Sequence, residues 1–355
     1  MSRPFAGAEA SGCIAATNRS VSCRLTDRST IGQARRTAVA LGSQAGLDDT
    51  ALGNLSLVVS ELAGNAVQHA GGGELLLRIL ADSPSAGVEV LCLDRGPGIR
   101  DVTESLRDGY STGGTMGTGL GAVRRLASDF DLYSIPGQGS AAVARVRPKG
   151  LPGDPRGARI AGLALPVATE TASGDAWATV AAGGRTLVLL VDGLGHGSSA
   201  ADAANTATRL FCEHGQKDVA ELMTVLHQGL RGTRGAAAAI AEIDPGTHEL
   251  RYSGIGNISA SVLTGSGSRS LVSHNGIVGH QARPARIFTY PWQQESMLIL
   301  HSDGVSSRWK LETYPGLLRR DPAIVAGILY RDHARERDDK SVVACRLGQQ
   351  ELPPS

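Results

Sequence analysis

The apolar side chains in the first third of the chain recur at intervals of three and four residues over two long segments. Such spacing places them on one face of an α-helix, and Asp48 is well suited to cap the second helix. Runs enriched in aliphatic and β-branched residues follow and predict strands. The predicted helices span residues 29–45, 48–70 and 120–128, and the predicted strands span 74–81, 87–94 and 140–147. These elements predict an α/β sandwich with helices on one face of a mixed sheet.

The second half of the chain begins again with strands and gathers its helices between two groups of them. The predicted strands span residues 159–168, 176–183, 186–192, 236–243, 248–253, 259–264, 296–302 and 341–346, and the predicted helices span 198–213, 217–230 and 322–335. This order predicts two packed β-sheets with helices on the outside, an α-β-β-α sandwich. The chain is therefore expected to be an α+β protein of two domains.

Residues 147–157 separate the two halves and contain three prolines and three glycines. That composition cannot continue a helix or a central strand, so it predicts a linker at 148–157. Few contacts are expected across this linker, and each half is predicted to fold on its own. The expected divisions are a flexible tail at 1–24, domains at 25–147 and 158–348, and a second tail at 349–355.

Charge and cysteine content narrow the class of protein. The 35 lysines and arginines nearly balance the 34 aspartates and glutamates, which leaves no net field to attract nucleic acid or an anionic membrane. No apolar run approaches the roughly 20 residues of a membrane helix, and the N-terminus lacks the pattern of a signal peptide. The five cysteines are dispersed without a Cys-x-x-Cys pair, which is typical of reduced thiols in a cytoplasmic protein.

A first candidate motif lies in the second predicted helix. Glu61, Asn65 and His69 recur at i, i+4 and i+8, so they share one face. A carboxylate and an amide one turn apart can hold Mg²⁺ and orient a nucleophile beside a triphosphate. A solvated polar stripe has the same spacing, so this motif alone leaves both interpretations open.

Two glycine-rich motifs follow. Asp94 begins the segment DRGPGI directly after an apolar strand, where a carboxylate can accept the exocyclic amine of a base while glycines let the backbone approach a flat ring. An ordinary turn has the same composition. The segment 112–121 opens onto a helix, and its backbone N–H groups form a natural phosphate cradle. This loop is neither a Walker loop nor a dinucleotide fingerprint.

In this order the three motifs resemble the N, G1 and G2 boxes of the GHKL (Bergerat-fold) ATPases over about residues 25–147. The run 108–112 is similar to the RsbT type of switch kinase, whose members phosphorylate a serine of a small STAS-domain protein. The resemblance implies ATP with Mg²⁺, Glu61 as general base, Asn65 as Mg²⁺ ligand and Asp94 as reader of adenine. It also implies a pocket and lid formed by Gly96, Gly98, Gly113, Gly114, Gly117, Thr118, Gly119, Leu120 and Gly121.

Four separated aspartates stand out in the second half, each at the start or end of a predicted strand: Asp175, Asp192, Asp303 and Asp338. Acidic residues at strand ends can converge where two sheets meet. Their oxygen ligands suit Mg²⁺ or Mn²⁺ rather than zinc, and two such ions about 4 Å apart can stabilise in-line attack on a phosphate. For any single Asp-Gly pair, a turn is the more ordinary explanation.

In their order these aspartates resemble the PPM family of metal-dependent phosphatases, in its compact SpoIIE/RsbX branch, over about residues 158–347. The resemblance implies two Mn²⁺ or Mg²⁺ ions bridged by one carboxylate and one backbone carbonyl. The implied metal ligands are Asp192, the Gly193 carbonyl, Asp175, Asp303 and Asp338, with Asp339 as the alternative to Asp338.

Other residues of this half are assigned more modest roles. His196 is expected to be structural or to orient water, and the tract 254–257 is expected to serve packing. The arginine that eukaryotic members place before their first metal ligand to bind phosphate has no counterpart here.

Together the two resemblances imply a bifunctional serine/threonine kinase and phosphatase. Its substrate would be a STAS-domain regulator, an anti-sigma antagonist, in a partner-switching stress or sigma-factor pathway. Two alternatives remain for the first half: a nucleotide-gated module that docks a STAS protein or sigma-factor complex without transfer, and an allosteric module acting on the phosphatase. The presence of Glu61 and Asn65 favours the kinase, because a pure binding module needs no base.

Overall fold

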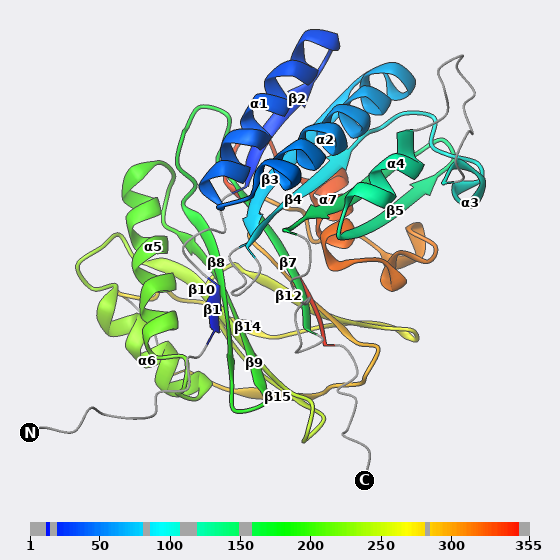
Figure 1. The fold of residues 1–355 in the computed structure, drawn as a ribbon. Coiled ribbons are helices and arrows are strands. Elements are labelled where there is room, and N and C mark those ends of the chain that lie inside the picture. The colour runs from blue at the N-terminus through cyan, green and yellow to red at the C-terminus, as the bar shows by residue number, and fades with distance from the viewer. Residues whose placement is uncertain are drawn as a thin grey trace, which may run out of the picture.

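The first half of the chain forms a five-stranded sheet with helices on one face (Figure 1). The computed structural model describes residues 12–14, 20–80, 86–106, 119–148, 158–280 and 285–347. Across the sheet the strands are β2 (Val21–Leu25), β3 (Gly73–Leu80), β4 (Gly87–Leu93), β6 (Gly139–Val146) and β5 (Asp129–Ile135). All four pairings are antiparallel, so the expected mixed sheet is wrong. Hairpins join β3 to β4 and β5 to β6, which reverses the direction of neighbouring strands.

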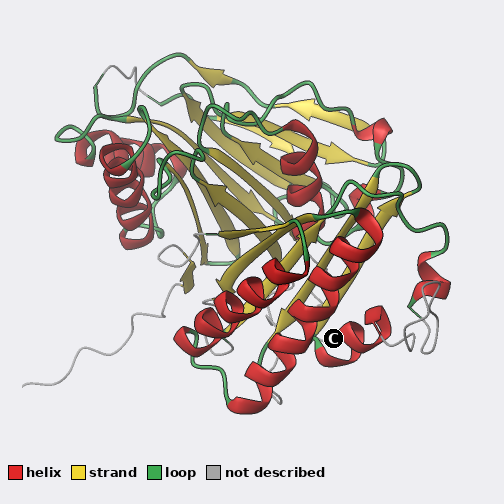
Figure 2. Ribbon diagram, turned by 90° about the horizontal axis from the view of Figure 1, so that it is seen from above, coloured by secondary structure: helices red, strands yellow, loops and turns green. Residues whose placement is uncertain are grey.

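Two long helices cover the outer face of this sheet and lie side by side in both views (Figures 1 and 2). The helices of this half are α1 (Arg28–Gln44), α2 (Asp49–Ala70), the short α3 (Val102–Ser105) and α4 (Gly119–Leu126). The Asp48 carboxylate caps α2 by accepting the Ala51 N–H at 2.7 Å. Gly71 ends α2 in the left-handed conformation, at φ +72°, which glycine adopts without strain. The predicted helical layer is confirmed.

The second half forms two sheets packed face to face. One sheet has the order β1-β8-β9-β10-β11-β14, with β15 also paired to β11, and the other has the order β13-β12-β16-β17-β7. The strands are β1 (Gly12–Ile14), β7 (Ala158–Leu165), β8 (Asp175–Ala182), β9 (Arg185–Gly193), β10 (Ala236–Asp244), β11 (Glu249–Ile255), β12 (Ser259–Thr264), β13 (Gly267–Ser270), β14 (Ser273–His274), β15 (Phe288–Pro291), β16 (Met297–His301) and β17 (Lys340–Leu347).

Helices cover the outer faces of both sheets, as predicted. They are α5 (Ser198–Glu213) and α6 (Val219–Gly229) on the first sheet and α7 (Pro322–His333) on the second, with short 3-10 turns at Leu311–Thr313 and Leu317–Arg319. Trp177 on β8 is fully buried between the sheets. A Cβ at Gly162 on β7 would lie 2.5 Å from the Trp177 ring, so glycine is needed for this close approach. The α-β-β-α sandwich is confirmed.

The two halves share one hydrophobic core, so the expectation of few contacts between them is wrong. Helix α7 lies against the face of the N-terminal sheet that α1 and α2 leave uncovered (Figure 1). Leu76, Leu91 and Leu93 on that face pack in one cluster with Ile324 and Leu329 of α7. Residues 149–157 of the predicted linker lie outside the described part of the chain. Linker composition carries no information on the apolar surfaces that meet elsewhere.

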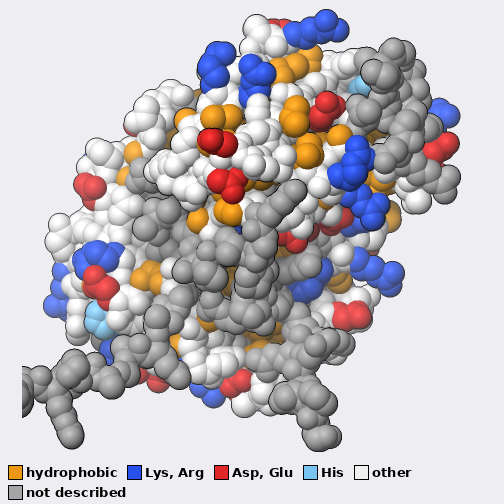
Figure 3. Space-filling view, viewed as in Figure 1, with side chains coloured by type: hydrophobic (Ala, Val, Ile, Leu, Met, Phe, Trp, Pro, Cys, Tyr) orange, Lys and Arg blue, Asp and Glu red, His pale blue; other side chains and the backbone are white. Residues whose placement is uncertain are grey.

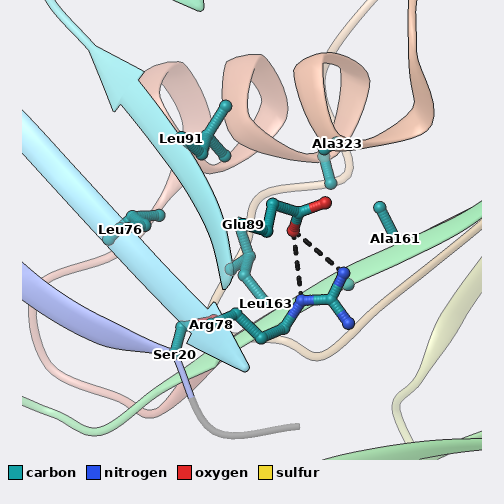
Figure 4. Close-up of a pocket in the computed structure, with 10 residues that line it drawn as sticks. Ser20, Leu76, Arg78, Glu89, Leu91, Ala161, Leu163 and Ala323 are labelled. Atoms are coloured by element: carbon teal, nitrogen blue, oxygen red, sulfur yellow. Dashed lines mark hydrogen bonds and ion pairs between the residues drawn. The ribbon is translucent and has the colours of Figure 1, made fainter. Parts of the chain in front are cut away.

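A buried charge network crosses the same interface. Figure 4 shows one part of it, the pair of Arg78 and Glu89. Arg78 donates to Glu89 at 2.9 Å and 3.1 Å, and both side chains are almost fully buried. Arg145 lies beside the same carboxylate at 2.8 Å and forms two 2.7 Å hydrogen bonds with Asp321, the N-cap residue of α7. Burial alone would raise the pKa of Glu89, but Arg78 and Arg145 outweigh it and hold that pKa below its usual range.

Replacement of Glu89 by glutamine is therefore expected to destabilise the whole chain. It leaves the buried Arg78 guanidinium without its carboxylate and leaves Arg145 with Asp321 alone. Removal of one partner of a buried ion pair typically costs about 3–5 kcal/mol. Urea unfolding of the full chain checks this, with Glu213→Gln as control because Glu213 pairs with Arg209 at the surface. Since the pKa of Glu89 is lowered on folding, its contribution should be present at neutral pH and disappear in acid. A loss below about 1 kcal/mol would contradict the account of this interface.

The N-terminal segment is more structured than a flexible tail. Residues 21–24 belong to β2, which pairs with β3 at the edge of the N-terminal sheet. Farther upstream, β1 pairs with β8 of the second half, and Cys13 forms a disulfide with Cys212 of α5. The expectations of a tail through residue 24 and of five reduced cysteines are both wrong at these points. Pairing of β1 with a distant strand brings Cys13 to Cys212 across 199 residues of sequence.

Basic and acidic side chains are interspersed on the described part of the face seen in Figure 3, so this face has no patch of a single charge sign. None of the described helices combines the length and apolar character that a membrane crossing requires. That nucleic acid is not a partner stays a prediction.

Candidate nucleotide and phosphatase sites

The first site forms where α2 faces the beginning of α4. Glu61 and Asn65 lie one turn apart on α2, as their spacing predicts. A Cβ placed on Gly119, the first residue of α4, would lie 3.2 Å from Glu61 Oε2 and 3.6 Å from Asn65 Nδ2. The carboxylate and the amide therefore meet the helix N-terminus that follows the glycine-rich loop. This N-terminus presents free backbone N–H groups, which favour an anion such as phosphate.

Asp94 lies at the end of β4, where the neighbouring chain fixes its carboxylate. Its Oδ1 accepts hydrogen bonds from the Gly96 N–H at 2.8 Å and from the Ser140 N–H at 3.2 Å. Burial raises the pKa of Asp94, and these two N–H groups act in the opposite direction. A Cβ at Gly96 would lie 2.4 Å from the Ala70 Cβ, so the chain can pass the end of α2 only with glycine there.

The remaining predicted pocket residues divide into placed and unplaced groups. Gly98 adopts φ +71°, and a Cβ there would lie 2.3 Å from the Ile135 carbonyl oxygen. Leu120 packs against the core of the N-terminal half, and Gly121 is buried within α4. The residues outside the described part of the chain are Gly113, Gly114, Gly117 and Thr118, together with the run 108–112.

The second site forms at one end of the two packed sheets. Asp175 begins β8 and is the register partner of Asp192, which lies near the end of β9. Asp303 follows β16, and Asp338 precedes the adjacent β17. Burial is the largest cause that raises the pKa of Asp192 to about 9, and repulsion from the other aspartates is the next. The structure thus brings carboxylates from both sheets into electrostatic contact.

Asp338 and Asp339 have different surroundings. Asp339 is buried, and its two carboxylate oxygens accept the Val167 N–H at 2.7 Å and the Gly174 N–H at 2.5 Å. Asp338 is only partly buried and raises the pKa of Asp303, together with burial. Asp338 Oδ1 in turn accepts the Asp339 N–H at 2.9 Å. Asp339 therefore holds the two loops together, and the assignment of Asp338 as a ligand stays a prediction.

The glycine after Asp192 is required by packing. A Cβ at Gly193 would lie 2.3 Å from the Ala200 carbonyl oxygen at the start of α5. The Gly193 N–H donates to the Gly174 carbonyl at 2.9 Å, which ties the loop before Asp175 to that after Asp192. His196 Nδ1 lies 2.9 Å from Glu170 Oε1, at the surface. This contact agrees with the structural role expected of His196.

Sequence reasoning missed a polar residue and two arginines at this site. Asn257, assigned to packing, donates from Nδ2 to Asp303 Oδ2 at 2.6 Å. Arg335 lowers the pKa of Asp303 against the effect of burial, so its guanidinium lies near that carboxylate. Arg234 Nη1 would lie 3.2 Å from a Cβ on Gly195, in the loop after Asp192 and Gly193. The sequence signal for Asn257 is its position directly after Gly256, between two predicted strands. In the structure Gly256 adopts a positive φ.

The aspartate cluster has the composition of a site for hard cations. Among the described residues, no group of three or more His, Cys, Asp or Glu side chains already closes around a single point. The four carboxylates nevertheless repel one another in a partly buried place, as the raised pKa values of Asp175 and Asp192 indicate. Carboxylate oxygens that remain separated suit divalent cations that keep several water ligands. The residues present therefore fit Mg²⁺ or Mn²⁺.

Comparison with known proteins finds a family match in each half of the chain. Residues 25–144 match the histidine kinase-like ATPase domain, and residues 182–346 match the Stage II sporulation protein E (SpoIIE) model. The serine/threonine-protein kinase RsbT of Bacillus subtilis (strain 168) is 38% identical over 86 residues, 24% of this chain and 65% of RsbT. The phosphoserine phosphatase RsbX of the same strain is 25% identical over 118 residues, 33% of this chain and 59% of RsbX. The chain thus covers less than two thirds of either relative.

A solved structure supports the same fold. It comes from work on the bacterial stressosome as a modular system adapted to control secondary messenger signalling. It has a TM-score of 0.50 and 25% identity, and the match covers 53% of this chain and 99% of that chain.

The chain therefore consists of a GHKL-type ATPase domain followed by a PP2C-type phosphatase domain. The first is similar to the kinase RsbT, and the second to the phosphatases SpoIIE and RsbX.

Proposed function

We propose that this chain both adds phosphate to a serine or threonine of a STAS-domain regulator and removes it again. The observation that supports the proposal is that candidate reactive side chains that are separated in the sequence come near one another in each half. Glu61 and Asn65 meet the N-terminus of α4, and Asp175, Asp192, Asp303 and Asp338 gather at one end of the two sheets.

In the kinase half, Glu61 is proposed to accept the proton of the substrate hydroxyl as it attacks the terminal phosphate of ATP. Asn65, one turn along α2, would hold the Mg²⁺ that accompanies ATP, and Asp94 would accept the exocyclic amine of adenine. Gly113, Gly114, Gly117 and Thr118 are proposed to take part in binding ATP. Backbone N–H groups at the start of α4 would stabilise the charge that the phosphate carries during transfer.

In the phosphatase half, two Mn²⁺ or Mg²⁺ ions would be held by Asp192, the Gly193 carbonyl, Asp175, Asp303 and Asp338. Two such ions supply Lewis acidity for the attack of water on a phosphate ester. Asn257 holds Asp303 through its hydrogen bond, and Ser341 donates to Asp175 at 2.8 Å.

The proposed partner follows from the two relatives together. RsbT is a serine/threonine-protein kinase and RsbX is a phosphoserine phosphatase, and this chain resembles both in one molecule. A STAS-domain protein of the anti-sigma antagonist type, in a stress or sigma-factor pathway, would serve as substrate for both domains. Its complex with a sigma-factor regulator is a further candidate partner.

Metal dependence tests the phosphatase half directly. The full chain should hydrolyse p-nitrophenyl phosphate and a phosphoserine protein only with Mn²⁺ or Mg²⁺, and excess chelator should abolish both reactions. Arg335 and Arg234 are proposed to bind the substrate phosphate, so alanine at either position should raise KM about tenfold or more. This factor corresponds to the loss of one charge-assisted hydrogen bond to the phosphate. Arg269→Ala, on the exposed β13, is the control. Hydrolysis that survives chelation would exclude the proposed phosphatase chemistry.

One observation favours the alternative that the first domain also regulates the second. The loop of Asp94 is held by Arg331, a residue of α7 in the phosphatase domain. Regulation of this kind does not require that the kinase be inactive.

A further inference from the structure

The last turn of α7 holds the loop that carries the adenine-reading carboxylate. Arg331 Nη1 donates to the Asp94 carbonyl oxygen at 2.8 Å and to the Ser140 carbonyl oxygen at 3.4 Å. Arg95, next to Asp94, pairs with Asp332 at 3.0 Å and also donates to the Arg331 carbonyl. The nucleotide loop is thus attached to the phosphatase domain at Asp94 and at Arg95.

The residues that follow α7 hold the loop that carries a proposed metal ligand. The Arg335 N–H donates to the Gly304 carbonyl at 2.8 Å, and the Ser306 N–H donates to the His333 carbonyl at 2.9 Å. Gly304 directly follows Asp303. The five residues 331–335 therefore contact the Asp94 loop at one end and the Asp303 loop at the other.

Packing around Gly304 leaves the metal loop little freedom to move separately. A Cβ at Gly304 would lie 1.8 Å from the Asp339 carbonyl oxygen, so the Asp303 loop is pressed against the Asp338–Asp339 turn. Upstream, residues 322–329 of α7 are buried between the two halves. Close-packed interiors respond to a local change by moving connected elements together.

We propose that an adenine nucleotide bound at the Asp94 loop changes the affinity of the phosphatase domain for its divalent cations, through residues 331–335. This inference rests on the proposed function for both ligands. Thermodynamic linkage requires the coupling to be reciprocal, so metal binding must change nucleotide affinity by the same factor. Couplings of this kind typically change affinity by about 5–150-fold.

Calorimetric titration of the full chain with Mn²⁺ tests the proposal. Adenosine is the probe for the nucleotide loop, because it carries the base but no phosphate to chelate the metal. Saturating adenosine is expected to change the Mn²⁺ dissociation constant at least fivefold, with a matching shift in the Mn²⁺ concentration that half-activates hydrolysis of p-nitrophenyl phosphate. The reciprocal titration of adenosine, with and without Mn²⁺, should give the same factor.

Variants assign the effect to the proposed contacts. Arg331→Ala and Arg95→Ala should each abolish the shift while adenosine and Mn²⁺ still bind separately. The Arg95 side chain is 65% exposed, so its removal should leave the fold intact. Arg100→Ala is the control, because Arg100 lies in the same loop and forms no hydrogen bond or ion pair with α7 among the described residues.

The outcomes separate this inference from the proposed function. An unchanged Mn²⁺ affinity in the presence of bound adenosine would overturn the coupling while leaving both activities intact. Absence of adenosine binding, or a shift that persists in both Arg331→Ala and Arg95→Ala, would overturn it as well. Absence of Mn²⁺ binding by the chain would instead remove the proposed phosphatase site itself.

Discussion

Replacement of Asp192 by asparagine is expected to lower metal-dependent phosphatase activity about a thousandfold. Asp192 faces Asp175 across the β8–β9 pair and is proposed to contact both cations, so the amide removes charge from both at once. Loss of several kcal/mol of charge stabilisation corresponds to this factor. Steady-state hydrolysis of a phosphoserine protein over a range of Mn²⁺ concentrations measures the effect.

Folding of this variant can be checked independently. Burial and the neighbouring carboxylates disfavour the charged form of Asp192, so a neutral amide should leave metal-free stability equal or higher. Mn²⁺ should raise the melting temperature of the wild-type chain and no longer do so in Asp192→Asn. Glu249→Gln is the matched control, because Glu249 lies on the surface at the start of β11. Full activity in Asp192→Asn would exclude the bridging role.

Replacement of Glu61 by alanine is expected to lower phosphate transfer about 100-fold or more, the contribution typical of a general base. Nucleotide binding should be retained, because Asp94 and the glycine-shaped pocket are unchanged. Asn65→Ala should weaken both binding and transfer, since Asn65 is proposed to hold the Mg²⁺ that accompanies ATP. Transfer of labelled phosphate to the partner protein, with nucleotide affinity measured in parallel, distinguishes the two variants.

The control for these substitutions is Gln68→Ala, on the exposed part of the same helix. A Glu61→Ala protein that phosphorylates its partner at the wild-type rate would remove the assigned base. The first domain would then be a binding or regulatory module, and the coupling through α7 could still be present.

The elements with strong periodicity were predictable because their signals are local. Helix α2 occupies Asp49–Ala70, one residue from the prediction, since Asp48 caps it and Gly71 ends it. Strand β5 was missed although Phe130 and Leu132 alternate with acidic residues. Asp131 lies at the interface between the two halves and does not simply face solvent. Its carboxylate accepts the Asp321 N–H at 2.8 Å.

The shared core was missed although two segments carried a signal for it. Every residue of β4, Gly87–Leu93, is buried, and a near-continuous apolar run indicates a strand covered on both faces. Residues 322–329 of α7 are apolar around the whole helix, which indicates burial on all sides. A linker rich in proline and glycine is compatible with a shared core, because its composition says nothing of the surfaces that the two apolar runs bury.

The sequence predicted which residue types form the candidate sites, but it did not predict the contacts that hold those residues. Four aspartates at strand ends suggested convergence, and the pairing of Asp175 with Asp192 agrees with it. The hydrogen bond of Asn257 to Asp303 depends on tertiary packing that no local pattern reports. The same holds for the disulfide of Cys13, whose partner is set by strand pairing at long range.

The central claim is that one chain adds phosphate to a protein and removes it again. It is tested most directly by incubating the full chain with a STAS-domain protein and γ-labelled ATP. The first step contains no more Mg²⁺ than the ATP binds, so that little divalent cation is free for the phosphatase site, and the second step follows nucleotide removal and addition of Mn²⁺. Label should enter the partner in the first step and leave as inorganic phosphate in the second. Asp192→Asn should retain the label, and Glu61→Ala should scarcely incorporate any. A partner that is never labelled by the wild-type chain, or that keeps its label after Mn²⁺ is added, would contradict the account.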